Sequence, residues 1–167
     1  YVVAAEEALA LKPTNLTFEQ AATVPVSAVT ALQGLRAGQI QPGQKVLING
    51  ASGGVGAFAV QLAKAFGAEV TAVCSTGKMA MARSLGADHV IDYTQEDFSR
   101  NGQTYDVIFD VAGKSPFSRS MASLNPNGRY VLGNPRPSDR VRAPLASGKG
   151  GKQVIIGTSA VTSEDLD

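Results

Sequence analysis

Hydrophobic positions along the chain change between two spacings, and this change predicts strands alternating with helices. Short apolar runs rich in β-branched residues favour buried strands, whereas apolar residues three or four positions apart favour helices. Val55, Ala59, Leu62 and Phe66 follow the helical spacing, for example, and Gly67 ends that helix. Beyond residue 44 the pattern predicts strands at 45–49, 69–74, 89–92, 105–110, 129–132 and 153–156, helices at 55–66, 78–85 and 115–124, and a turn at 125–128.

The remaining segments are less periodic. Residues 1–4 read as a strand, Thr17 caps a short helix, and Pro25 opens a helix over 27–36. The segment 134–152 is rich in proline, glycine, serine and lysine. This composition predicts a mobile loop between the last two strands.

Strands rich in Val and Ile that alternate with helices predict a parallel sheet covered by helices on both faces. The helical connections between such strands are right-handed. The expected fold class is therefore α/β, a doubly wound parallel sheet (Rossmann fold) with the strand order 3-2-1-4-5-6.

Composition narrows the classes of protein that this sequence fits. The 167 residues suit one domain, and 44% of them are apolar. Fifteen Lys and Arg against fourteen Asp and Glu leave a net charge of +1, so no nucleic-acid partner is expected. The cations over 136–152 are interpreted as a solvated loop, with a polyanion site as the alternative. No apolar run reaches the roughly 18 residues of a membrane span, so no membrane partner is expected.

One cysteine, Cys74, excludes a disulfide within the chain and a cysteine-rich zinc site. A reducing compartment suits such a chain, and we expect a cytoplasmic location. Cys74 ends an apolar strand and is interpreted as a small buried group. Asp110 also ends a strand, and we expect its charge to face solvent or a helix cap.

The glycine-rich loop over 50–56 (GASGGVG) joins the strand at 45–49 to the first long helix. A helix start offers unpaired N–H groups and the positive end of the helix dipole, and both favour a phosphate. The absence of side chains at Gly53 and Gly54 lets a pyrophosphate approach the backbone, while Gly56 lets the helix lie close to the strand. In this strand–turn–helix context the loop indicates dinucleotide binding.

Two other functions share this loop. GASGG also fits the G-x-S-x-G turn of α/β-hydrolases, but the one histidine, His89, lies soon after the loop rather than beyond a late acid. The loop also resembles the fingerprint of short-chain dehydrogenases, whose chemistry needs Tyr-x-x-x-Lys. No tyrosine of this chain has lysine four places on. The hydrolase stays a minor alternative, and the short-chain dehydrogenase is set aside.

The end of the second strand indicates which nucleotide is bound. An Asp or Glu at this point would bond the ribose 2′-hydroxyl of NAD. The stretch instead reads Val-Cys-Ser-Thr-Gly-Lys, and Ser75, Thr76 and Lys78 offer two hydroxyls and an ammonium. These groups suit a 2′-phosphate, so the expected cofactor is NADP(H). The alternative is helix capping by the hydroxyls and a surface charge at Lys78.

Several motifs together resemble the medium-chain dehydrogenase/reductase superfamily, and most closely its quinone-reductase-like (zeta-crystallin-like) branch. They are TVPVSAVTAL at 23–32, GASGGVG at 50–56, CSTGK at 74–78 and LGADHVIDY at 85–93. The likeness runs from the first residue to about residue 132, and the motifs occur in the family's order.

The resemblance implies cofactor contacts in three groups: with the pyrophosphate, the 2′-phosphate and the nicotinamide half. The residues so implied are, respectively, Gly53, Gly54 and Val55; Ser75, Lys78 and Tyr93; and Thr30, Gly113 and Gly133. Tyr93 could also be an exposed strand-end aromatic, and Thr30 could bond within its own helix. No catalytic residue and no metal ligand is implied within this chain.

The resemblance also implies that the chain is the cofactor domain of a longer enzyme. Residues 1–24 would lead out of a catalytic domain, 25–160 would form the NADP-binding Rossmann domain, and 161–167 would start a return segment. The parent would transfer hydride from NADPH to a small-molecule quinone or an activated C=C bond, and the chain alone is expected to be inactive. The strand at 153–156 would pair two copies into a homodimer.

Two alternatives stay open beside this one. The chain could be the cofactor domain of a zinc-dependent alcohol dehydrogenase, whose zinc ligands would lie elsewhere in the parent. It could also be a nucleotide-binding module without turnover.

Overall fold

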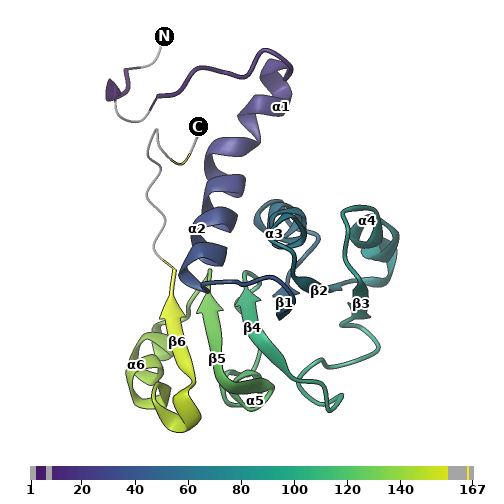
Figure 1. Ribbon diagram of the computed structural model, residues 1–167, viewed down its shortest axis with the longest axis vertical. Helices are drawn as coiled ribbons and strands as arrows, with labels where there is room; N and C mark the ends of the chain where they lie inside the picture. Colours follow the sequence, from purple (N-terminus) through teal and green to yellow (C-terminus); the bar gives the residue numbers. More distant parts are fainter. Residues whose placement is uncertain (1–2, 7–8, 158–164, 166–167) are drawn as a thin grey trace.

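The computed structural model, which describes residues 3–6, 9–157 and 165, contains a six-stranded sheet of parallel strands. The strand order is β3-β2-β1-β4-β5-β6, which confirms the doubly wound α/β fold (Figure 1). All strands except β5 have the predicted bounds. The strands are β1 (Lys45–Asn49), β2 (Glu69–Cys74), β3 (His89–Asp92), β4 (Tyr105–Asp110), β5 (Leu124–Leu132) and β6 (Gln153–Ile156).

β5 begins at Leu124 rather than at residue 129, so the turn predicted at 125–128 is wrong. Leu124 pairs with Tyr105, and the register then shifts before Arg129 pairs with Val107. Asn127 takes a positive φ of 61° within this stretch. The turn-forming residues therefore make a bulge inside the strand instead of ending it.

Helices cover both faces of the sheet (Figure 1). On one face, α2, α3 and α4 bury small and branched side chains such as Leu35, Val60 and Ala82 against β1 and β2. On the other face, α5 and α6 cover a core that includes Phe117 and Tyr130. The helices are α1 (Phe18–Ala22), η2 (Val24–Ala28), α2 (Val29–Ala37), α3 (Gly54–Ala65), η3 (Thr76–Lys78), α4 (Met79–Ser84), α5 (Phe117–Ala122), α6 (Pro137–Ala146) and η4 (Lys149–Gly151).

Several predicted helix and strand bounds need correction. The helix expected over 27–36 is divided into the π-helical η2 and the α-helical α2. The helix expected over 115–124 is shorter, because Pro116 has an extended backbone before α5 and residue 124 already belongs to β5. Of the strand expected at 1–4, residues 3 and 4 are not in a strand, and the rest lies outside the described residues.

The segment 134–152, predicted to be a mobile loop, contains α6 and η4. Pro137 occupies the first turn of α6, where its missing N–H is not needed. The backbone N–H of Arg136 donates to Asp139 Oδ2 at 3.0 Å, and its Nε donates to the same oxygen at 3.0 Å. Pro137 therefore helps to start a helix in a segment whose composition predicted a loop.

Asp139 should contribute to stability in a pH-dependent way. The carboxylate is 1% exposed. Burial alone would raise the pKa of Asp139, but the hydrogen bonds from Arg136 outweigh it and lower the pKa below its usual value. This stability is therefore present above the unfolded-state pKa and is lost as the pH falls through the lower folded-state pKa. We expect Asp139→Asn to reduce the free energy of unfolding by about 2 kcal/mol at pH 7 and by less at pH 3, measured by urea titration. An equal loss at both pH values would contradict this role.

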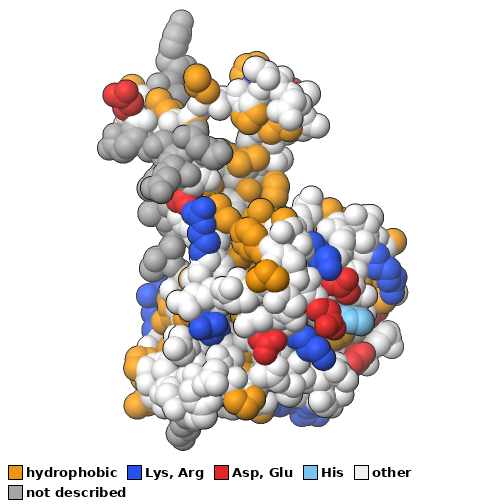
Figure 2. Space-filling model, in the orientation of Figure 1, with side chains coloured by type: hydrophobic (Ala, Val, Ile, Leu, Met, Phe, Trp, Pro, Cys, Tyr) orange, Lys and Arg blue, Asp and Glu red, His pale blue; other side chains and the backbone are white. Residues whose placement is uncertain are grey.

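Apolar side chains lie exposed along the segment that precedes β1. Phe18 is 79% exposed and Val26 is 68% exposed. In Figure 2 hydrophobic side chains gather on the column formed by α1 and α2, above the sheet. Such a surface suits contact with further protein. Among the described residues, no helix combines the length and the apolar character that crossing a bilayer requires.

Candidate functional site

The strand order places a switch point between β1 and β4. The connections from β1 run through α3 and α4 on one face, whereas those from β4 run through α5 and α6 on the other (Figure 1). In open α/β sheets, ligands bind in the crevice at the carboxyl ends of the strands where the connections diverge. Asn49 and Asp110 are register partners at the carboxyl ends of β1 and β4. These two residues therefore mark the centre of the candidate site.

The glycine-rich loop at 50–56 directly follows Asn49, at the carboxyl end of β1. Gly50 turns the chain with φ of 90°, and the N–H groups of Gly50 and Ala51 both donate to the Val73 carbonyl, at 3.2 and 3.0 Å. Gly53 is the N-cap of α3, and no side chain caps this helix. The first turn of α3 therefore keeps backbone N–H groups for an anion, as the sequence predicted.

A Cβ atom at each glycine of the loop would meet different surroundings. At Gly53 it would touch only the Gly50 carbonyl oxygen, at 3.6 Å, and at Gly54 it would meet Ser27 Oγ at 2.7 Å. At Gly56 it would collide with the backbone of Gly50 and lie 2.7 Å from the Cα of Ala51. Gly56 thus lets α3 lie against the loop after β1, whereas Gly53 leaves space in front of the helix.

A cleft of about 570 Å³ opens at the carboxyl ends of β1, β2, β3 and β4. Tyr93, which the resemblance implied as a cofactor contact, lines the cleft, but most of the other lining residues were not predicted. The lining residues are Asn49, Gly50, Ser52, Val73, Cys74, Tyr93, Glu96, Asp97, Phe98, Ala112, Lys114, Ser115 and Pro116.

The structure brings the backbone of Tyr93, which lines the cleft, next to the chain at Cys74 and Ser75. Ser75 follows β2 directly, and the Tyr93 N–H donates to the Cys74 carbonyl at 3.1 Å. The Tyr93 side chain is 64% exposed, and Lys78 is exposed at the end of η3. Within the described residues, Lys78 makes no ion pair. Lys78 thus lies three residues after Ser75 with its side chain exposed.

Thr76 has a different environment from the one predicted. Its hydroxyl donates to the Asp92 carboxylate, and Asp92 also accepts from the Thr94 N–H at 2.9 Å. The hydrogen bond from Thr76 is the main cause that lowers the pKa of Asp92. One of the two hydroxyls that the sequence offered to a phosphate is therefore held by a carboxylate.

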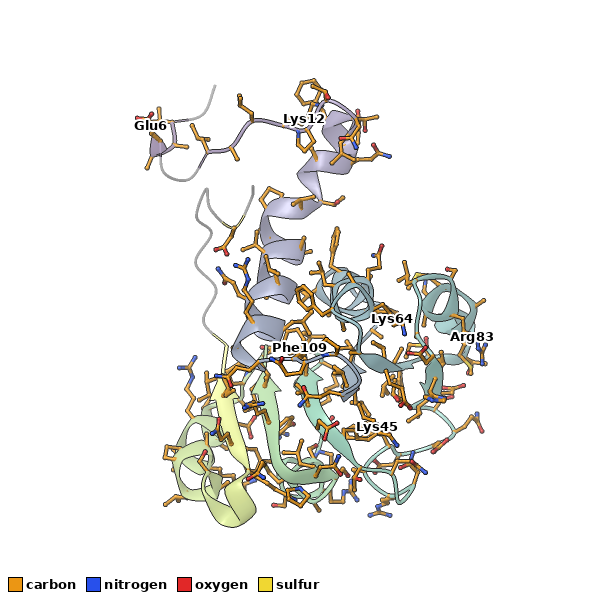
Figure 3. All side chains as sticks on the ribbon, viewed as in Figure 1. Glu6, Lys12, Lys45, Lys64, Arg83 and Phe109 are labelled. Carbon is orange, nitrogen blue, oxygen red and sulfur yellow. The ribbon has the colours of Figure 1, made fainter. Side chains whose placement is uncertain are left out.

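Thr30 and Gly133 lie together, but away from this cleft. They line a separate hollow of about 250 Å³ between α2 and the carboxyl ends of β5 and β6, with Gly34 and Phe109 at its wall. Figure 3 shows Phe109 beneath the lower end of α2, between the helix and the sheet. Gly113 lies between Ala112 and Lys114, which line the cleft; its φ is 66°, and a Cβ there would come within 2.6 Å of the Asn134 carbonyl oxygen.

Asp110 is 1% exposed, so the expectation that its charge faces solvent or a helix cap is wrong. Its Oδ1 accepts from Asn49 Nδ2 and from the Gly113 N–H, each at 2.9 Å, and its Oδ2 accepts from the Tyr130 hydroxyl at 3.0 Å. Asn49 and Asp110 each end a strand directly after three apolar residues, and that position was the signal that could have marked them in the sequence.

Cys74 is 1% exposed, as predicted for a small buried group. Burial is the main cause that raises the pKa of its thiol. Since the thiolate is the reactive form of cysteine, this environment does not favour a nucleophilic role.

The chain is similar in sequence and in fold to known oxidoreductases. A family model described as zinc-binding dehydrogenase matches residues 54–165. The NADPH-dependent alkenal/one oxidoreductase of Arabidopsis thaliana, a chloroplastic protein, is 44% identical over 115 residues, which are 68% of this chain and 30% of that protein.

Two solved structures are similar over most of the chain. The quinone oxidoreductase from Coxiella burnetii superposes with a TM-score of 0.82 at 30% identity, covering 93% of this chain and 49% of that one. The quinone oxidoreductase from Thermus thermophilus, also solved in complex with NADPH, gives a TM-score of 0.72 at 34% identity, covering 86% of this chain and 47% of that one. The chain thus spans less than half the length of these relatives.

Proposed function

The chain belongs to the zinc-binding dehydrogenase family of medium-chain dehydrogenases/reductases, and on this premise we propose that it is the NADP(H)-binding domain of an oxidoreductase. The parent enzyme transfers hydride from NADPH to a quinone or to an activated C=C bond. The observation that carries the proposal is the uncapped start of α3, held over the switch point between β1 and β4 with no side chain in front of Gly53.

The geometry of the loop fits a dinucleotide. A pyrophosphate needs backbone N–H groups and close access, and the first turn of α3 with Gly53, Gly54 and Val55 offers both. Lys78 would add a cation for the 2′-phosphate, with Ser75 and Tyr93 beside it. A relative named as NADPH-dependent and a neighbour solved with NADPH support NADP(H) over NAD(H).

In this proposal the protein binds and orients the cofactor, and NADPH supplies the hydride when bound. Gly113 and Gly133 would border the nicotinamide half, where they let Asn134 and Phe109 pack closely against their backbones. Thr30 would approach the same half from α2. The protein needs no nucleophile of its own for this chemistry.

The family's name refers to zinc, but the described residues do not fit a zinc site. No group of three or more His, Cys, Asp or Glu side chains among them could hold a metal ion. We therefore assign no step of the reaction to zinc in this part of the chain.

The organisation of the parent follows as part of the same proposal. Residues 25–160 form the cofactor domain, 1–24 lead out of a catalytic domain, and 161–167, largely outside the described residues, begin a return segment. β6 lies at an edge of the sheet, where a second copy could pair with it to form a homodimer. The cytoplasmic location stays a prediction.

NADPH should stabilise the chain against heat more than NADH does. A ligand at 100 times its Kd raises stability by about 2.7 kcal/mol, which for a domain of this size raises the Tm by about 5–10 °C. Differential scanning fluorimetry at equal NADPH and NADH concentrations measures both shifts. The same sample, mixed with a simple quinone, should oxidise no NADPH above the blank. A Tm unchanged by millimolar NADPH and by millimolar NADH would remove the proposal.

A further inference from the structure

Asp110 is a buried carboxylate whose position needs an explanation. Burying a charge is unfavourable unless hydrogen bonds or an opposite charge compensate it. Three donors satisfy Asp110, but no cation within the described residues is hydrogen-bonded to it. The nearby Arg136 guanidinium instead donates to Asp139 and, at 3.0 Å, to the Ser115 carbonyl. Asp139, by contrast, is equally buried and has Arg136 as its partner.

The donors to Asp110 come from three separate parts of the chain. Asn49 ends β1, Gly113 lies in the loop after β4, and Tyr130 lies on β5. Asn49 and Asp110 are also the last register pair between β1 and β4. One carboxylate therefore ties together three segments where the connections of the sheet diverge, next to the proposed pyrophosphate site.

The carboxylate also determines which way the Asn49 amide is turned. A carboxylate only accepts hydrogen bonds, so Asn49 must present its nitrogen to Asp110. Its second N–H donates to Ser115 Oγ at 2.8 Å. Both N–H groups are thus in use, and the amide oxygen is the polar atom that Asn49 keeps for a donor. Asn49 and Ser115 both line the cleft.

We propose that Asp110 is a positioning residue for the dinucleotide: it acts through Asn49, Gly113 and Ser115 to hold the cleft in the shape that admits the cofactor. This inference rests on the proposed NADP(H) site. It predicts that loss of the Asp110 charge weakens NADPH binding, whereas simple charge repulsion predicts the opposite change. Removing a negative charge beside a polyanionic ligand would tighten binding, whereas loss of positioning weakens it.

The test is Asp110→Asn, which keeps the size of the side chain and removes the charge. A carboxamide has one acceptor oxygen and an NH₂ group, so it loses all charge-assisted bonds, and the Tyr130 hydroxyl must accept a hydrogen bond instead of donating one. We expect the folded variant to bind NADPH about tenfold more weakly at 25 °C, measured by isothermal titration calorimetry, as loss of a hydrogen bond to a charged group implies. Unchanged or tighter binding by the folded variant would overturn the positioning role.

Asp139→Asn is the matched control, because Asp139 is buried to the same extent but lies outside the lining of the cleft. It should lose stability and keep its NADPH affinity within about twofold. An equal loss of affinity in both variants would reduce the effect of Asp110 to general destabilisation and would overturn the proposal.

Tyr130→Phe keeps the proposal testable if Asp110→Asn does not fold. It removes the hydroxyl on Oδ2 and keeps the ring beside Phe117, at a centroid distance of 5.7 Å. We expect about threefold weaker NADPH binding, and an unchanged affinity would overturn the proposal. The unaltered chain is titrated first: failure to bind NADPH there removes the proposed function, whereas binding there with unaltered affinity in the variants removes only the role of Asp110.

Discussion

Replacing Gly56 with alanine should lower the free energy of unfolding by about 3 kcal/mol or more, although alanine favours helices over glycine. The helix propensity alone would stabilise the chain by roughly 1 kcal/mol. The new Cβ, however, would collide with the Gly50 carbonyl oxygen and lie 2.7 Å from the Ala51 Cα and 2.8 Å from the Gly50 carbonyl carbon. These are backbone atoms, so no side chain can rotate away, and α3 would have to move from the loop that follows β1.

The measurement is the Tm in a thermal scan, where a loss of about 3 kcal/mol lowers the Tm by about 6–12 °C in a domain of this size. Gly53→Ala is the matched control in the same loop. Its φ of −81° and ψ of 170° suit alanine, and its Cβ would meet only the Gly50 carbonyl oxygen at 3.6 Å. This control should keep the Tm of the unaltered chain. A Gly56→Ala protein as stable as Gly53→Ala would show that the loop and α3 do not pack as closely as the structure has them.

Sequence patterns were sufficient to predict the sheet and to locate the glycine-rich loop. The alternation of apolar runs and helical spacings predicted the strand order and the bounds of every strand except β5, because buried parallel strands read directly as short β-branched runs. The loop at 50–56 was located by its context between a strand and a helix. These features depend on residues close together in the chain.

The side-chain contacts that the sequence did not predict join residues that are distant along the chain. The hydroxyl of Thr76 bonds Asp92, and Asp110 collects donors from β1 and β5. Both contacts require the register of neighbouring strands, which no local pattern contains. The bulge in β5 and the start of α6 at Pro137 were missed because turn-forming residues also occur inside strands and at helix starts. Polar residues that end apolar strands are therefore the positions to examine first in such a sheet.

Replacing Lys78 with alanine should weaken NADPH binding by about 10- to 100-fold and leave NADH binding unchanged within about twofold. The two cofactors differ only in the 2′-phosphate, so a residue that recognises this group affects one of them. Lys78 is exposed and makes no ion pair among the described residues, and it lies three residues after Ser75 at the carboxyl end of β2. Since Asp92 holds the Thr76 hydroxyl, we expect the ammonium of Lys78 to contribute more of the recognition than the sequence suggested.

The measurement is the Kd of each nucleotide at one fixed ionic strength, because salt screens an exposed charge. Lys45→Ala is the matched control: Lys45 begins β1 (Figure 3), at the end of the strand opposite the cleft, so its loss removes the same charge away from the cleft. It should change neither affinity by more than about twofold, which separates direct recognition from a change in net charge. If Lys78→Ala weakened NADPH and NADH equally, Lys78 would not read the 2′-phosphate. The preference for NADP(H) would then depend on Ser75 and Tyr93, the other two groups at that end of the cleft.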